Sequence, residues 1–289
     1  MAGTIKNILW TTDFSPQGQE ALHYAGLFAR AFSAGITALH VIPDLAPAFY
    51  ADTPVIAQEL TGRMAEATQK GEAQFKAIEK KRGLTFKKRV IVEGSAAKKI
   101  VETAEKEKAD LIVMGKKGQS MIERVLIGSV ANHVLRHSPV PVLMAKRGKR
   151  PAGIKKILVP TDFTKEEDLE REYAWDLAKA FDASLTFLYV LELHGHEFRM
   201  VDHMFDTALA RFQKRAHQAR KGITVSKDVT RAVTAAAGID EYSRERRFDL
   251  IVMATCARGL GRFFLGSTTE KVISHSDLPV FALPPHFCR

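Results

Sequence analysis

Short apolar runs alternate with longer amphipathic stretches along the first half of the chain. The apolar runs have the length and β-branched content of buried strands and cover residues 5–12, 36–42, 85–94, 110–115 and 140–145. After the first run, apolar residues recur every three or four positions, as Leu22, Ala25 and Phe28 do. That spacing is typical of a helix with one buried face.

The same spacing predicts four helices between the apolar runs. The first starts at Pro16 and is ended by Gly35, the second covers 56–81, and the third covers 96–108. Ser95 is expected to cap the third helix with its hydroxyl. The fourth starts at Ser129. Strands that alternate with helices predict an α/β fold, in which helices cover both faces of a parallel sheet.

The chain repeats itself. The stretch from Lys6 to Ile42 aligns without a gap with the stretch from Lys155 to Leu191, and about two in five positions are identical. "ADLIVMG" at 109–115 matches "FDLIVMA" at 248–254, and "IGSVANHVLRHSPVPVLM" at 127–144 matches "LGSTTEKVISHSDLPVFA" at 265–282. The period is too long for a solenoid, so each copy is expected to be a domain. We place the domains at 1–148 and 152–289, joined by the basic "KRGKRPAG".

Composition narrows the functional classes. Of the 289 residues, 46% are hydrophobic and 26% are charged, which is an ordinary balance for a soluble globular protein. No apolar run approaches the length of a membrane helix, and the two cysteines cannot form a disulfide framework, so we expect a cytoplasmic protein. The net charge of +10 is scattered and lacks interleaved aromatic residues, so we do not expect a nucleic-acid partner.

A glycine-spaced turn follows the fourth predicted strand. Gly115, Gly118, Gly128 and Ser129 form the pattern G-x2-G-x9-G-S between that strand and the next helix. Glycines allow positive φ and close approach to the backbone, and the N-terminal amides of a helix attract anions. Lys116 and Lys117 would add cationic screening. These residues would suit phosphate binding, but two plain turns and a helix cap explain them at least as well.

The combined motifs resemble the universal stress protein family. "ILWTTDFS", "ALHVI" and "VMGKKGQSMIERVLIGSV" carry the resemblance, which covers nearly the whole chain as two copies. It implies two doubly wound five-stranded parallel sheets in the order 3-2-1-4-5, packed as a pseudo-dimer through the final strands. It also implies ATP, ADP or AMP, with or without Mg²⁺, bound beyond strands one and four.

The resemblance assigns roles to residues of the first copy. Asp13 would lie at the adenine and ribose end, Val41 would contact adenine through its backbone, and Met114 and Gly115 would line the ribose. The phosphates would be held by Gly118, Gly128, Ser129 and Val130. Thr11 departs from the family's usual proline, which the second copy has as Pro160.

The second copy departs from the glycine pattern. Ala254 and Ala257 replace Gly115 and Gly118, and any position there that needs positive φ would be strained. Partial binding stays open, because Asp162, Gly266, Ser267 and Thr268 remain. We expect the first domain to bind nucleotide and the second to bind weakly or not at all.

Two further groups could carry chemistry. His194, His196, Glu197, Asp202 and His203 could bind a divalent metal, but their spacing matches no standard motif and favours an ordinary polar loop. Cys256, near Arg258, could be redox-reactive; an ordinary small residue explains it as well.

The sequence thus predicts a stress-response protein that binds ATP or ADP and has no metal site. We do not expect an enzyme, since no water-positioning group accompanies Asp13 or Asp162; slow ATP hydrolysis is the most we would expect. The alternative is a nucleotide-free scaffold for a protein or a small hydrophobic ligand. A protein partner and further dimerisation of whole chains stay open.

Overall fold

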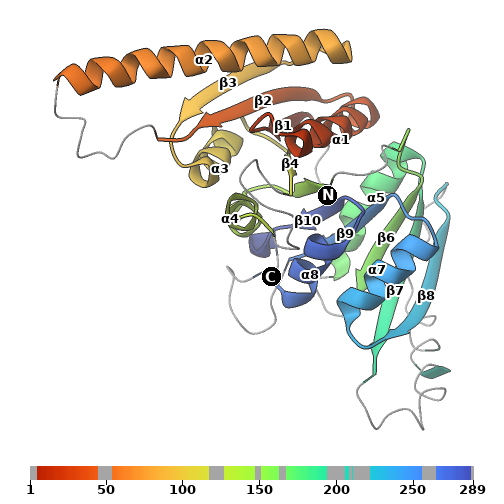
Figure 1. Ribbon diagram of the computed structural model, residues 1–289. Coiled ribbons are helices and arrows are strands. Elements are labelled where there is room, and N and C mark those ends of the chain that lie inside the picture. The colour runs from red at the N-terminus through yellow and green to blue at the C-terminus, as the bar shows by residue number, and fades with distance from the viewer. Residues whose placement is uncertain are drawn as a thin grey trace.

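The computed structural model describes residues 5–44, 54–116, 127–146, 151–162, 167–193, 206–207, 210, 222–255 and 265–287. In these ranges strands and helices alternate along the first half and, apart from one pair of consecutive strands, along the second (Figure 1). The first half contains β1 (Asn7–Thr11), α1 (Pro16–Phe32), β2 (Gly35–Ile42), α2 (Pro54–Arg82), β3 (Lys88–Glu93), α3 (Ala96–Lys106), β4 (Leu111–Gly115), α4 (Ser129–His137) and β5 (Val142–Ala145). The second contains β6 (Lys156–Thr161), α5 (Glu167–Phe181), β7 (Ser184–Glu192), β8 (Val225–Ala232), α7 (Ala235–Glu245), β9 (Leu250–Ala254), α8 (Ser267–His275), β10 (Val280–Leu283) and the short 3₁₀ helix η3 (Pro285–Phe287).

The ten strands form one continuous sheet in the order β3-β2-β1-β4-β5-β10-β9-β6-β7-β8. Within each half the paired strands run parallel in the order 3-2-1-4-5, as predicted. The halves meet where β5 and β10 pair antiparallel, with Leu143 opposite Phe281. The predicted packing as a pseudo-dimer through the final strands is therefore confirmed.

The two faces of the sheet carry different helices and two hydrophobic clusters. One cluster joins the sheet to α1, α2 and α5, and the other joins it to α3, α4, α7 and α8. Each cluster contains fully buried side chains from both halves, such as Phe28 with Phe281 on the first face and Val134 with Val272 on the second. The two halves consequently share their core.

Aromatic rings connect the halves on the α1 and α5 face. Phe28 lies parallel to Phe281, with ring centroids 6.1 Å apart, and meets Phe181 edge-on at 4.9 Å. Tyr24 and Phe28 are buried, whereas Phe32, Tyr173 and Phe181 are partly buried against the same cluster. The aromatic stripes of α1 and α5 thus add to the contact that β5 and β10 make between the two copies.

Two details of the helix ends differ from the sequence prediction. Helix α1 ends at Phe32 and is capped by Ser33 in the left-handed conformation, with φ 54°, while Gly35 begins β2. Ser95 precedes α3, but its side chain makes no capping hydrogen bond within the described structure. Helix α1 is therefore capped two residues earlier than predicted, and the described residues leave the start of α3 without a side-chain cap.

Candidate functional site

The β1–α1 turn fixes Asp13 through a series of local hydrogen bonds. Thr12 Oγ1 accepts from the Phe14 amide at 2.9 Å, and Asp13 Oδ1 accepts from the Ser15 amide at 3.0 Å. Ser15 Oγ then caps α1 by accepting from the Gly18 amide at 3.1 Å. These bonds make the turn a rigid support for the Asp13 carboxylate.

Phe14 holds this turn in a left-handed conformation. Its φ is 62°, which is uncommon for a bulky residue. The ring packs against His40 at 4.4 Å and Phe75 at 5.1 Å between centroids, and His40 Nδ1 lies 2.9 Å from the Thr12 carbonyl oxygen. Tertiary packing therefore stabilises the conformation that places Asp13 at the carboxyl end of β1.

Gly18 is required by the same turn. A Cβ there would lie 2.7 Å from Thr12 Oγ1 and 3.1 Å from Asp13 Oδ1. Gly18 was not predictable from the sequence, because a single glycine inside a helical pattern gives no signal of such a contact.

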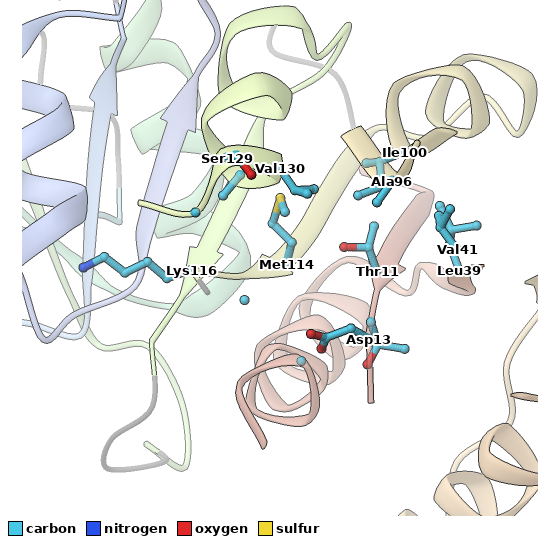
Figure 2. A pocket seen from close by; sticks show the side chains of 15 residues that line it. Thr11, Asp13, Leu39, Val41, Ala96, Ile100, Met114, Lys116, Ser129 and Val130 are labelled. Carbon is cyan, nitrogen blue, oxygen red and sulfur yellow. The ribbon is translucent and has the colours of Figure 1, made fainter. Parts of the chain in front are cut away.

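A cavity of about 320 Å³ opens beyond the carboxyl ends of β1 and β4 (Figure 2). Its lining comes from β1, β2, β4 and the first turns of α1, α3 and α4. The lining residues are Thr11, Thr12, Asp13, Gly18, Leu39, Val41, Ala96, Ile100, Met114, Gly115, Lys116, Gly128, Ser129, Val130 and Ala131. The volume is near the lower end of the range for small-molecule sites.

The cavity brings together most of the residues predicted for the first half. Asp13, Val41, Met114, Gly115, Gly128, Ser129 and Val130 all line it. Gly118 and Lys117 lie outside the described residues, as do Ala257, Cys256, Cys288 and the residues from His194 to His203. Among the described residues, no group of three or more His, Cys, Asp or Glu side chains is placed to hold a metal.

The apolar wall was not predicted in full. Besides Val41 and Met114 it contains Leu39, Ile100 and Ala96. A signal for it existed. Leu39 and Val41 alternate along one face of β2, and Ala96 and Ile100 are one helical turn apart on α3.

Helix α4 presents its N-terminus to the cavity. Gly128 is its N-cap, and the Asn132 amide donates to Gly128 O at 2.9 Å, which is the first bond of the helix. The amides of Ser129, Val130 and Ala131 precede this bond, so they have no acceptor within the helix. The first turn contains no acidic residue. This end of the cavity therefore suits an anion.

Gly115 is required by close packing and not by its backbone conformation. It is not among the glycines with positive φ, and a Cβ on it would lie 3.0 Å from the backbone carbon of Gln17. The N-terminus of α1 thus packs directly on this glycine. Because the matching glycine does not use positive φ, the strain expected of an alanine at a positive-φ position does not apply at Ala254.

Lys116 was predicted to screen phosphate charge in the cavity, but its ammonium group lies elsewhere. Its side chain is buried, with 4% exposed, and its Nζ donates to the carbonyl oxygen of Ser274 in the second half. Figure 2 shows this side chain pointing away from the other labelled residues. Besides Lys116, Asp13 is the charged residue among the described residues that line the cavity.

The corresponding positions of the second half form hydrogen bonds of their own. Asp162 follows β6, while Gly266, Ser267 and Thr268 form the start of α8, as Gly128, Ser129 and Val130 do for α4. The Ala254 amide donates to Glu170 Oε1, and the Ala254 carbonyl accepts from Thr269 Oγ1 at 2.8 Å. In the first half, Glu170 and Thr269 correspond to Ala21 and Ala131, whose side chains cannot form such bonds.

A third hydrogen bond between a side chain and a backbone group lies at the start of α7. The Ala235 amide donates to Glu192 Oε1 at 2.5 Å, and Thr234 Oγ1 accepts from Ala237 N at 3.3 Å. The counterpart of Ala235 is Ala96, which lines the first-half cavity, and the counterpart of Glu192 is Pro43. In the second half, side chains therefore form hydrogen bonds with the backbone of Ala254 and Ala235. The counterparts of these two residues, Gly115 and Ala96, line the first-half cavity.

A model of one protein family matches both halves of the chain. The family model described as "Universal stress protein family" matches residues 4–146 and again residues 153–284. The chain belongs to the universal stress protein family. Two copies of the family's domain therefore follow each other in one polypeptide.

Three relatives illustrate the likeness. A universal stress protein of Methanocaldococcus jannaschii is 34% identical over 50% of this chain and 84% of its own length. The crystal structure of a universal stress protein from Archaeoglobus fulgidus is 26% identical, covers 96% of this chain and 98% of its own, and has a TM-score of 0.67. A universal stress protein solved in complex with cAMP is 26% identical over 50% of this chain and 98% of its own, with a TM-score of 0.35.

Among the described helices, none has both the length and the apolar character needed to span a bilayer.

Proposed function

We propose that this universal stress protein binds an adenine nucleotide, ATP or ADP, in the first-half cavity, and that the second half binds none or binds weakly. The observation that carries the proposal is the combination of an apolar slot with an anion-binding helix terminus in one cavity. Leu39, Val41 and Ile100 suit a flat heterocycle, and the α4 amides suit a phosphate.

Asp13 would select the ribose. Its carboxylate lines the cavity, in a turn held by three local hydrogen bonds, and a carboxylate readily accepts hydrogen bonds from sugar hydroxyls. Ser129 would donate its hydroxyl to a phosphate oxygen. Gly118 would hold the phosphates as well, on the evidence of the glycine pattern alone. Mg²⁺ would accompany the phosphates where ATP is the ligand.

The asymmetry between the halves rests on the bonds formed by Glu170, Thr269 and Glu192. These side chains bond to backbone groups at positions that line the cavity in the first half. A nucleotide in the second half would have to compete with them, and leaving such groups unsatisfied costs about 1–3 kcal/mol each. We therefore assign nucleotide binding to the unit spanning 1–148 and not to the unit spanning 152–289.

A matched pair of variants tests the proposal. Gly128 and Gly266 are the N-caps of α4 and α8 and have extended conformations that valine can adopt, with φ −62° and −63°. Calorimetric titration with ATP should show at least tenfold weaker binding for Gly128→Val and little change for Gly266→Val. Loss of binding in Gly266→Val with retention in Gly128→Val would contradict the assignment.

One observation favours a second candidate, a nucleotide-free scaffold that binds a small hydrophobic ligand. Leu39, Val41, Ile100, Met114 and Val130 make much of the lining apolar. Titration with ATP in the presence of a bound apolar dye separates the two candidates. A scaffold would bind an apolar dye that ATP does not displace, whereas the proposed site would release the dye as ATP binds.

A further inference from the structure

Lys116 connects the first-half cavity to the second half of the chain. Its backbone belongs to the cavity: the Lys116 amide donates to Ala145 O at 3.1 Å, and its carbonyl accepts from the Gly128 amide at 3.3 Å. Its side chain crosses the junction between β5 and β10, where Nζ donates to Ser274 O in the last turn of α8. One residue thus contacts both the N-cap of α4 and the C-terminus of α8.

The position of the ammonium group has a clear physical reason. The last carbonyls of a helix lack intrahelical donors and carry partial negative charge, so a cation is stabilised there. A buried lysine also needs such a partner, because burying an uncompensated charge is costly. Lys146 completes the arrangement: its Nζ donates to His275 O at 3.3 Å and forms an ion pair with Asp277. Its ammonium lowers the pKa of the Asp277 carboxyl.

The second half has no corresponding crossing among its described residues. Thr255 replaces Lys116 and repeats its backbone bonds, donating to Leu283 O at 2.9 Å and accepting from the Gly266 amide at 2.9 Å. Its hydroxyl donates to Leu283 O and so stays within its own half. Pro284 replaces Lys146. The described residues at this position of the second half therefore make no matching contact with α4 of the first half.

The bond between Gly128 and Lys116 leaves room to tighten. At 3.3 Å between nitrogen and oxygen it is longer than the usual range, whereas the matching bond in the second half is 2.9 Å. A phosphate bound to the α4 amides would fix Gly128 against the Lys116 carbonyl. That contact would in turn fix the side chain that caps α8.

We propose that Lys116 couples occupancy of the first-half cavity to the last turn of α8, so that the second half senses the ligand without binding it. The inference rests on the proposed nucleotide binding. Coupling of this kind is reciprocal. The contact with Ser274 therefore also helps to position the Lys116 backbone for the ligand, and Lys116 acts as a positioning residue.

Hydrogen exchange on the full chain, measured with and without saturating ATP, tests the coupling. ATP should slow exchange in the first turn of α4 and, by roughly fivefold, at the end of α8 around Ser276 and Leu278. In Lys116→Met, at ATP concentrations that saturate this variant, α4 should still be slowed and α8 should not. Lys146→Met is the control, because it removes a cation from the same helix end without lining the cavity; there ATP should still slow α8.

The outcomes separate the two proposals. Slowing at α4 without slowing at α8 in the unaltered protein would overturn the coupling and leave nucleotide binding intact. Unchanged slowing of α8 in Lys116→Met would overturn the role of Lys116. Slowing at neither helix would refute nucleotide binding and the coupling with it. If Lys116→Met does not fold, Lys116→Gln, whose amide is polar but uncharged, takes its place. ATP should then slow exchange in α4 of this variant but not in α8.

Discussion

The carboxylate of Glu170 accepts a hydrogen bond from the amide of Ala254, at the end of the strand that corresponds to β4 of the first half. The first half has Gly115 and Ala21 at these two positions. The same strand end is thus bonded by a side chain in one copy and lines a cavity in the other.

Removal of this carboxylate should destabilise the protein. Glu170→Ala leaves the Ala254 amide without its acceptor, and we expect the free energy of unfolding to fall by about 1–3 kcal/mol. Urea unfolding followed by circular dichroism measures the loss. Glu241→Ala, at an exposed position on α7, is the control and should change stability by less than about 0.5 kcal/mol. Equal losses in the two variants would show that the Glu170 bond has no structural role.

The shared core predicts that both halves unfold together. The chain has two tryptophans, Trp10 in the first half and Trp175 in the second, and both are buried. In the variants Trp10→Phe and Trp175→Phe, fluorescence reports one half, while circular dichroism reports the whole chain. The two signals should give coincident urea transitions in each variant, as expected for a single cooperative unit. Separate midpoints would show that the halves are independent domains.

The raised pKa of Tyr24 predicts that the protein loses stability at alkaline pH. Burial, followed by the nearby Glu20 and Asp249 carboxylates, raises its pKa from 10.0 to about 12. The folded protein thus holds the phenol proton more tightly than the unfolded chain does. The stabilisation is fully present below pH 10 and is lost as the pH rises through about 12.

The measurement for Tyr24 is the free energy of unfolding between pH 9 and pH 12. A shift of two pKa units corresponds to about 2–3 kcal/mol lost across this range. Tyr24→Phe has no proton to lose, so its stability should fall less over the same range. Parallel curves for the two proteins would contradict the raised pKa.

Gly18 provides a test of the Asp13 turn. In Gly18→Ala the new methyl group would meet Thr12 Oγ1 and Asp13 Oδ1, so the carboxylate must shift. We expect ATP binding to weaken by about tenfold, which corresponds to about 1.4 kcal/mol. Gly26→Ala in the same helix is the matched control, because its methyl group would approach Arg30 no closer than 3.6 Å. Equal ATP affinities in the two variants would contradict a role of Asp13 in nucleotide binding.

The fold was largely predictable because the sequence repeats its own pattern. Apolar runs at the matching positions of the two copies identified the strands, and Val142 and Val280 begin the final strands that join the halves. Helix ends were less accessible. Ser33 adopts the left-handed conformation that glycine usually supplies, and the capping bond expected of Ser95 is not formed.

The lining of the cavity was predictable where a residue type carries its own chemistry, as with Asp13 and Gly128. It was not predictable where tertiary contacts decide the role. Lys116 follows Gly115 in the glycine motif, yet its ammonium group donates a hydrogen bond to Ser274 O in α8, far along the sequence. Likewise, nothing in the local sequence around Glu170 indicates that it will bond to the end of β9.

Native mass spectrometry of the full chain with ATP tests the central claim most directly, because it counts nucleotides per polypeptide. One bound nucleotide in the unaltered protein and in Gly266→Val, with none in Gly128→Val, is the predicted result. An empty chain at millimolar ATP, or a nucleotide that survives Gly128→Val but not Gly266→Val, would contradict it.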